Sequence, residues 1–102
     1  MKPQGIVLMA SCLLLWATVA AATDGKALFD RHCSSCHYQG DNPTYPSRPL
    51  FRLYREANGL RTQKDLVAKM RRGGQGMPSF AAKQLSDADA MAIAGYIIRT
   101  FD

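Results

Sequence analysis

The sequence predicts a small all-α protein of three to five helices, and three observations predict it. Apolar residues recur at helical spacing in several segments. Residues that cap helices precede these segments, and glycine or proline follows several of them. No segment shows the alternation of apolar and polar residues that is typical of a strand. A chain of 102 residues is one small domain at most.

Residues 1–22 are predicted to be a secretory signal. A short basic start precedes an apolar run over residues 6–22, and this run ends in three alanines. We expect cleavage after Ala22, which leaves a mature domain of residues 23–102. Two alternatives remain open. Residues 9–12 faintly resemble a lipoprotein cleavage site, and the apolar run approaches the minimum length of an uncleaved membrane anchor.

Capping residues indicate where the helices of the mature domain begin. Thr23 or Asp24 can cap the first helix. Thr62, with Asp65 three positions later, can cap another, and Ser86 can cap the last. We therefore expect helices over residues 25–32, about 50–57, from 62 to about 72 and from 86 to about 100, with turn-rich loops over residues 38–49 and 73–80.

Cys33, Cys36 and His37 form the C-x-x-C-H pattern of covalent haem attachment. Two thiols three positions apart in one helical turn lie on the same side, so each can add to one vinyl group of a porphyrin. The next residue then brings an imidazole under the iron. A redox disulfide would leave the histidine without a task, and a zinc site needs a second Cys or His pair that the chain lacks. The sequence therefore predicts one haem c.

An iron held by one histidine has an open sixth position, and its occupant decides between electron transfer and chemistry. Met70 and Met91 lie at the apolar spacing of helices, which favours core packing. His32 is held on the attachment side, so we expect it at the surface. Met77 lies among glycines that permit close approach to a porphyrin, although a packing role is its alternative. The full set of candidates is Met70, Met77, Met91, His32, Tyr45 and the lysines.

The attachment motif, the later Met77-Pro78-x-Phe80 loop and a final helix with Tyr96 resemble the class I cytochromes c, in particular their small bacterial and algal soluble members. The resemblance covers essentially all of the mature chain. It implies helices wrapped around one covalently attached haem c, with His37 as the proximal iron ligand and Met77 as the distal ligand.

The resemblance also implies how the first and last helices cross. Gly25 and Phe29 match one side of the crossing, and Ile93 and Tyr96 match the other. Gly95 is expected to ease the close approach of the two backbones.

Two further contacts with the haem follow from the resemblance. In this family a proline carbonyl accepts the Nδ1 hydrogen of the proximal histidine, and Pro46 or Pro49 is the expected acceptor here. The mature chain has no tryptophan to hold the haem propionates, because Trp16 lies in the predicted signal. Tyr45 and Arg48 are the candidates for that role.

The net charge is +5, and the positive charge is concentrated between residues 48 and 72, where the chain has eight basic residues and only two acidic ones. Such a run is most often a solvated helical face. The alternative is a docking surface for an acidic partner. The resemblance implies one exposed haem edge, and we expect Arg71 and Arg72 at its rim, with Arg52 and Arg55 as further candidates.

The predicted function is a periplasmic single-haem electron carrier between redox partner proteins, and it is not an enzyme. The alternative is the haem c subunit of a periplasmic dehydrogenase or reductase complex. We expect no binding of nucleic acid and no membrane anchor after cleavage of the signal.

Overall fold

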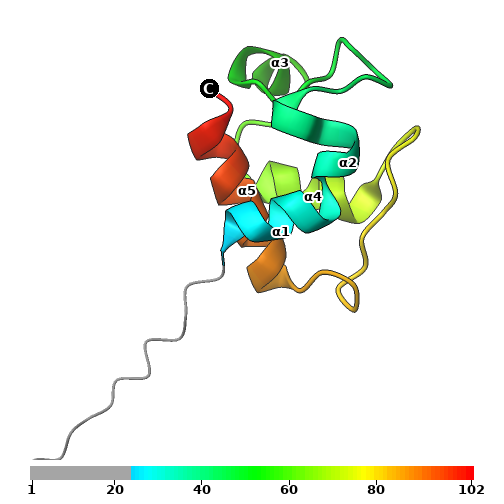
Figure 1. The fold of residues 1–102 in the computed structure, drawn as a ribbon, viewed down its shortest axis with the longest axis vertical. Helices are drawn as coiled ribbons and strands as arrows, with labels where there is room; N and C mark the ends of the chain where they lie inside the picture. The colour runs from blue at the N-terminus through cyan, green and yellow to red at the C-terminus, as the bar shows by residue number, and fades with distance from the viewer. Residues whose placement is uncertain (1–23) are drawn as a thin grey trace, which may run out of the picture.

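A computed structural model describes residues 24–102. The predicted signal at residues 1–22 lies outside the described residues, so its cleavage stays a prediction. Within residues 24–102 the chain forms five α-helices and one 3₁₀ turn, and it contains no β-strand (Figure 1). The all-α prediction is confirmed. The elements are α1 Gly25–His32, α2 Ser34–His37, the 3₁₀ turn η1 Tyr38–Gly40, α3 Arg52–Ala57, α4 Gln63–Arg72 and α5 Asp87–Thr100.

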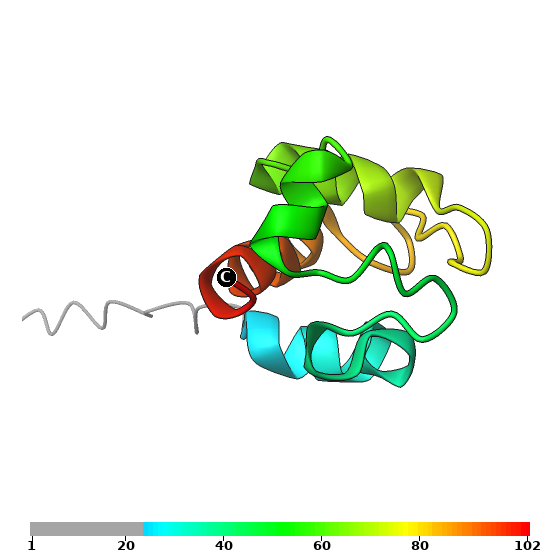
Figure 2. The same ribbon diagram turned by 90° about the horizontal axis from the view of Figure 1, so that it is seen from above.

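Helix α5 is the centre of the fold because both α1 and α4 pack against it (Figures 1 and 2). Its apolar composition requires such cover on several sides. The buried residues of α5 are Ala90, Ile93, Ala94, Gly95 and Ile97. Phe29 of α1, Leu66 and Met70 of α4, Leu85 and Phe101 complete the core.

The crossing of α1 and α5 depends on Gly25. A Cβ atom at this position would lie 3.0 Å from the Cβ of Tyr96 and 2.9 Å from the carbonyl carbon of Ala92. One turn further on, the rings of Phe29 and Tyr96 pack with centroids 5.3 Å apart. These contacts confirm the predicted crossing. The prediction for Gly95 is wrong, because that glycine faces side chains of Gln63 and Arg99 rather than α1.

The predicted helix caps are present. Asp24 caps α1 by accepting hydrogen bonds from the backbone N–H groups of Lys26 and Ala27. Thr62 and Asp65 form a reciprocal capping box at the start of α4, and Ser86 caps α5. These bonds satisfy backbone donors that have no partner within the helix.

The attachment segment is helical, as expected from two thiols that share one helical turn, but it forms a helix separate from α1. The backbone leaves helical geometry at Cys33, and residues 34–37 form the separate short helix α2. A 3₁₀ turn follows, and it contains Gln39 at a φ of 53° and Gly40 at a φ of 89°. A Cβ at Gly40 would lie 2.8 Å from the ring of Phe101, so the glycine lets this turn pack on the end of the core.

None of the helices in residues 24–102 combines the length and the apolar character needed to cross a membrane.

Candidate cofactor site

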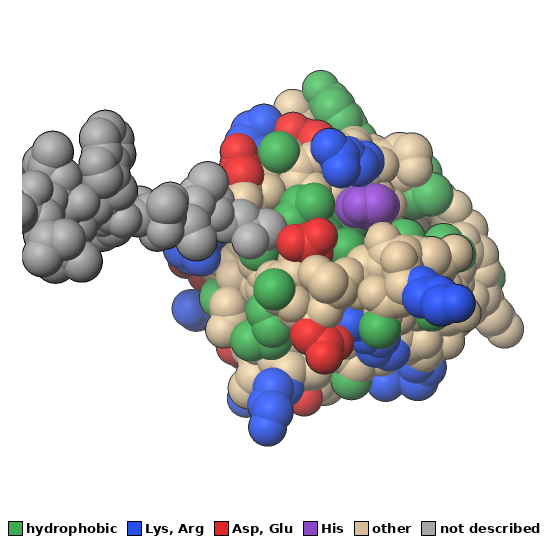
Figure 3. Space-filling model, turned by 90° about the horizontal axis from the view of Figure 1, so that it is seen from below, with side chains coloured by type: hydrophobic (Ala, Val, Ile, Leu, Met, Phe, Trp, Pro, Cys, Tyr) green, Lys and Arg blue, Asp and Glu red, His purple; other side chains and the backbone are tan. Residues whose placement is uncertain are grey.

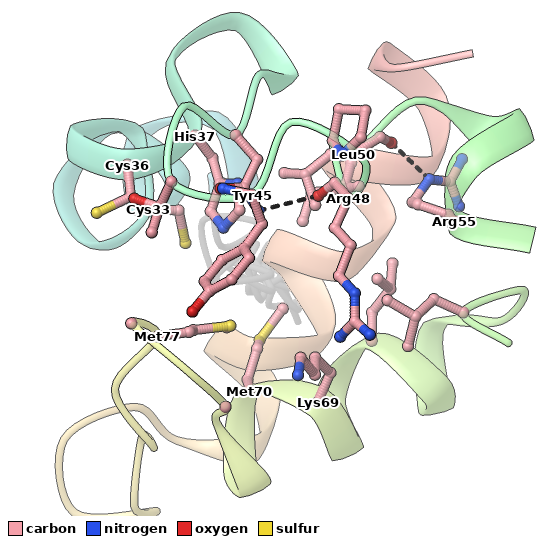
Figure 4. A pocket seen from close by; sticks show the side chains of 18 of the residues that line it. Cys33, Cys36, His37, Tyr45, Arg48, Leu50, Arg55, Lys69, Met70 and Met77 are labelled. Carbon is pink, nitrogen blue, oxygen red and sulfur yellow. Dashed lines mark hydrogen bonds between the residues drawn. The ribbon is translucent and has the colours of Figure 1, made fainter. Parts of the chain in front are cut away.

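A cleft of about 680 Å³ opens between two walls of the molecule. One wall comes from α2 and the loop over residues 42–50, and the other comes from α4 and the loop over residues 74–80 (Figure 4). Its volume lies within the range of about 300–1,000 Å³ that is usual for cofactor pockets. The cleft is therefore large enough for a haem, and its lining residues decide whether one fits.

Cys33 and Cys36 lie together at one end of this cleft (Figure 4). Both have free thiols, which leaves them available for thioether bonds. Burial raises the pKa of the Cys33 thiol to about 11. A thiol of high pKa is poorly suited to redox exchange, which depends on the thiolate. No cluster of three metal-binding side chains occurs in residues 24–102.

His37 points into the cleft from α2 (Figure 4). Its Nδ1 lies 3.1 Å from the carbonyl oxygen of Asp41. When Nδ1 carries the hydrogen, it donates to this oxygen and leaves the lone pair of Nε2 for a metal. The expected proline acceptor is thus replaced by Asp41, because the turn after α2 brings this nearer carbonyl to the ring.

Burial lowers the pKa of His37 below its ordinary value, although the bond to the Asp41 carbonyl works in the opposite direction. The imidazole is therefore neutral near pH 7. A neutral ring is the form that binds a metal.

Met77 lines the wall opposite His37, and its sulfur is turned toward the cleft (Figure 4). A tight turn carries it there. The backbone N–H of Met77 donates to the carbonyl of Gly74, and the N–H of Gly74 donates to the carbonyl of Met77, both at 3.1 Å. Gly76 adopts a φ of 72° within this turn, which glycine accommodates easily.

Met70 also lines the cleft, on the same side as Met77 in Figure 4. Its side chain is only 4 % exposed and belongs to the core cluster, as predicted. Met91 was expected in the core but is 37 % exposed, since it lies on the solvent side of α5. His32 was expected at the surface, yet it is half-buried, lines the cleft and meets Phe80 edge-on.

Basic residues gather at the end of the cleft away from the cysteines. Arg48, Lys69 and Arg72 line it there, and Figure 4 shows the first two. None of the three pairs with a carboxylate within residues 24–102. The pKa of Lys69 is lowered, first by burial and then by the charges of Arg72 and Arg48. This end of the cleft fits a group that carries carboxylates, as a haem does in its propionates.

Tyr45 connects the two walls at the mouth of the cleft. Its hydroxyl donates a hydrogen bond of 3.1 Å to the side-chain oxygen of Gln75. The methyl carbon of Thr44 would lie 3.3 Å from a Cβ at Gly76, so the two loops also meet closely there. Tyr45 therefore closes the cleft on the side of Met77.

Two arginines expected at a docking rim have other roles. Arg55 is 2 % exposed, and its guanidinium donates to the backbone carbonyls of Leu50 at 2.7 Å and Phe101 at 3.4 Å. Arg71 is directed inward, to carbonyl oxygens and to Asp87. Sequence reasoning missed both roles because the acceptors are mainly backbone oxygens, which leave no mark in the residue pattern.

A helical core that encloses one cleft, with a haem attachment motif on a short helix at its edge, is the organisation of the class I c-type cytochromes. The comparison with family models agrees. The model described as "Cytochrome C oxidase, cbb3-type, subunit III" matches residues 20–97, so the chain belongs to this family. Within it, the chain is a class I cytochrome c with one haem.

Curated relatives are cytochromes c6. That of Bumilleriopsis filiformis is 31 % identical over 75 residues, which cover 74 % of this chain and 86 % of the relative. That of Cyanidium caldarium is also 31 % identical and covers 76 % of this chain and 70 % of the relative.

Solved structures show the same fold. OmcF, an outer membrane cytochrome of Geobacter sulfurreducens, is 44 % identical with a TM-score of 0.75 over 76 % of this chain and 99 % of its own. Cytochrome c6A of Arabidopsis thaliana is 28 % identical with a TM-score of 0.68, and the match covers 72 % of this chain and 83 % of that structure. The chain is a small electron-transfer protein that holds one haem c, and it is not an enzyme.

Proposed function

We propose that this chain is a periplasmic electron carrier whose haem iron is bound by His37 and Met77, with Cys33 and Cys36 as the thioether attachments. The observation that carries the proposal is the position of the two ligand candidates on opposite walls of one cleft, with both cysteines at its end (Figure 4). The haem supplies a one-electron Fe(II)/Fe(III) couple. The side chains around it are proposed to bind the iron, to fix the orientation of the ligands and to tune the reduction potential.

His37 supplies a neutral nitrogen ligand, and the Asp41 carbonyl fixes the tautomer and the orientation of its ring. Met77 supplies a thioether, which is a soft ligand that favours Fe(II) and raises the reduction potential. With His37 and Met77 both bound to the iron, no coordination position would remain for a substrate. This arrangement favours electron transfer over catalysis, and it requires little rearrangement when the electron moves.

The alternative ligand is Met70, whose sulfur also faces the cleft. Met77 is favoured because it lies on a loop, whereas Met70 is fixed in the core between α4 and α5. The Met77→Leu variant should lose the weak long-wavelength absorption of a ferric iron–thioether bond and should bind added imidazole readily. The Met70→Leu variant should keep the absorption. A Met77→Leu spectrum like that of the unaltered protein would refute the assignment.

Export to the periplasm is supported by the apolar run over residues 6–22 and by the attachment chemistry, which takes place after export. The mass of the protein purified from the periplasmic fraction tests this part of the proposal. It should correspond to residues 23–102 plus one haem. Haem-loaded protein that keeps residues 1–22 would contradict cleavage.

A second candidate function is that of a haem subunit docked to a larger enzyme. The description of the matching family, which names a subunit of an oxidase, favours it. Purification from native cells separates the two functions. A free carrier runs alone at the size of one small domain, whereas a subunit elutes together with a larger chain.

Partner proteins of the carrier are proposed to be acidic at their docking surface. The exposed Arg48 and Arg72, unpaired within residues 24–102 and lying at the cleft, support this proposal. The face drawn in Figure 3 carries basic and acidic side chains side by side, so it offers no large area of one sign. The proposed contact lies instead at the basic end of the cleft, where Arg48 and Arg72 are exposed.

A further inference from the structure

The guanidinium of Arg71 binds two carbonyls of the segment between α4 and α5 and the first residue of α5. Nη1 donates to the carbonyl oxygens of Phe80 at 3.1 Å and Leu85 at 2.7 Å. Nη2 donates to a carboxylate oxygen of Asp87 at 2.6 Å. The Arg71 side chain is 25 % exposed, so solvent competes only partly for these bonds.

Phe80 is the residue through which these bonds act on the methionine loop. Its N–H donates to the carbonyl of Met70 at 2.8 Å, while its carbonyl accepts from Arg71. Both polar groups of this peptide segment are therefore tied to the last turn of α4. The other end of the loop is tied at Gly73, whose N–H donates to the carbonyl of Lys69 at 2.8 Å. Met77 lies between these two anchors.

From this geometry we infer that Arg71 is a positioning residue that keeps Met77 at the cleft. The inference rests on the proposed function, in which Met77 binds the iron. Long loops without regular structure open readily unless side chains hold them. Arg71 removes this freedom on the side of Phe80, so the closed position of Met77 depends on a residue that does not itself line the cleft.

The shape of the guanidinium explains why arginine occupies this position. Its planar fork carries five N–H donors, and here they reach two carbonyls and one carboxylate at once. A lysine keeps the charge but presents a single nitrogen on a flexible stem. The Arg71→Lys variant therefore separates the geometry of the fork from its charge.

Amide hydrogen exchange on the haem-loaded protein tests the inference directly. In Arg71→Gln, the N–H groups of Met77 and Phe80 should exchange about tenfold faster or more, because each lost bond from a charged donor is worth at least about that factor. Arg71→Lys should show most of the same acceleration. Amides of α1 should exchange as in the unaltered protein.

Thr62→Ala is the matched control, because it weakens the opposite end of the same helix by removing its cap. It should lower global stability without selective acceleration at Met77 and Phe80. Equal acceleration in Thr62→Ala, or an Arg71→Lys variant indistinguishable from the unaltered protein, would overturn the inference.

Imidazole binding to the ferric protein separates this inference from the proposed ligation. If Met77 binds the iron, Arg71→Gln should bind imidazole about tenfold more tightly, because the open loop is more populated. If Met77→Leu leaves imidazole affinity unchanged, the proposal that Met77 binds the iron is wrong. The exchange rates then still decide whether Arg71 positions the loop.

Discussion

Two buried glycines in neighbouring helices should respond in opposite ways to the same substitution. In Gly25→Ala the new Cβ would lie 2.9 Å from the carbonyl carbon of Ala92 and 3.0 Å from the Cβ of Tyr96. Backbone cannot move aside without separating α1 from α5. We expect a loss of about 1–3 kcal/mol, the usual cost of overpacking. The gain in helix propensity is small at the first position of α1.

Gly95→Ala is the matched comparison. Its Cβ would meet only the ends of the Gln63 and Arg99 side chains, at 2.7 and 2.9 Å. These flexible ends can rotate away, and alanine in a helix interior is worth up to about 1 kcal/mol over glycine. Gly95→Ala should therefore be neutral or stabilising. The two variants should differ in free energy of unfolding by about 1–4 kcal/mol.

Guanidinium unfolding of the haem-loaded variants, followed by helical circular dichroism, measures this difference. A difference of that size corresponds to at least about 4 °C in melting temperature for a domain of this length. If Gly95→Ala destabilises the protein as much as Gly25→Ala, the close contact is not particular to Gly25, and our description of the crossing is wrong.

Three other predictions follow from side chains of known exposure or charge. Met70→Ala should lower the free energy of unfolding by about 2–5 kcal/mol because Met70 is buried, whereas Met91→Ala should lower it by less than about 1 kcal/mol because Met91 is partly exposed. Equal losses of stability in urea unfolding would contradict the assigned burial. Hydrogen bonds from the N–H groups of Thr62 and Arg61 lower the pKa of Asp65, so its contribution to stability is present above the unfolded pKa of about 4 and is lost as pH falls further. Asp65→Asn should flatten this acid dependence, and an unchanged profile would refute its origin in the capping box. Arg72→Glu should slow electron exchange with an acidic redox protein at low salt, and the difference should shrink as the Debye length falls below about 10 Å. A rate that changes neither with the substitution nor with the salt concentration would show that the partner docks elsewhere.

The sequence was sufficient to predict features that depend only on residues close together in the chain. The attachment motif needs only the spacing of Cys33, Cys36 and His37, and the caps need only a side chain and the next turn of backbone. The crossing at Gly25 and Phe29 was also predictable, because the family resemblance supplied the partner helix.

The remaining errors concern contacts made across the fold. Arg55 donates to the carbonyl of Phe101, which is 46 positions away, and no pattern of side chains marks such an acceptor. Arg71 looks like any charge of a basic run until its acceptors are known. The helix that holds Met91 is apolar nearly all round, so periodicity could not tell which of its sides remains in solvent.

The central claim is that a haem in this cleft is bound between His37 and Met77. Proton NMR of the reduced protein tests it most directly, because the methyl group of a methionine bound to haem iron lies over the porphyrin and is shifted far upfield by its ring current. We predict one such methyl signal, which is absent in Met77→Leu and present in Met70→Leu. A signal that persists in Met77→Leu and disappears in Met70→Leu would contradict the account.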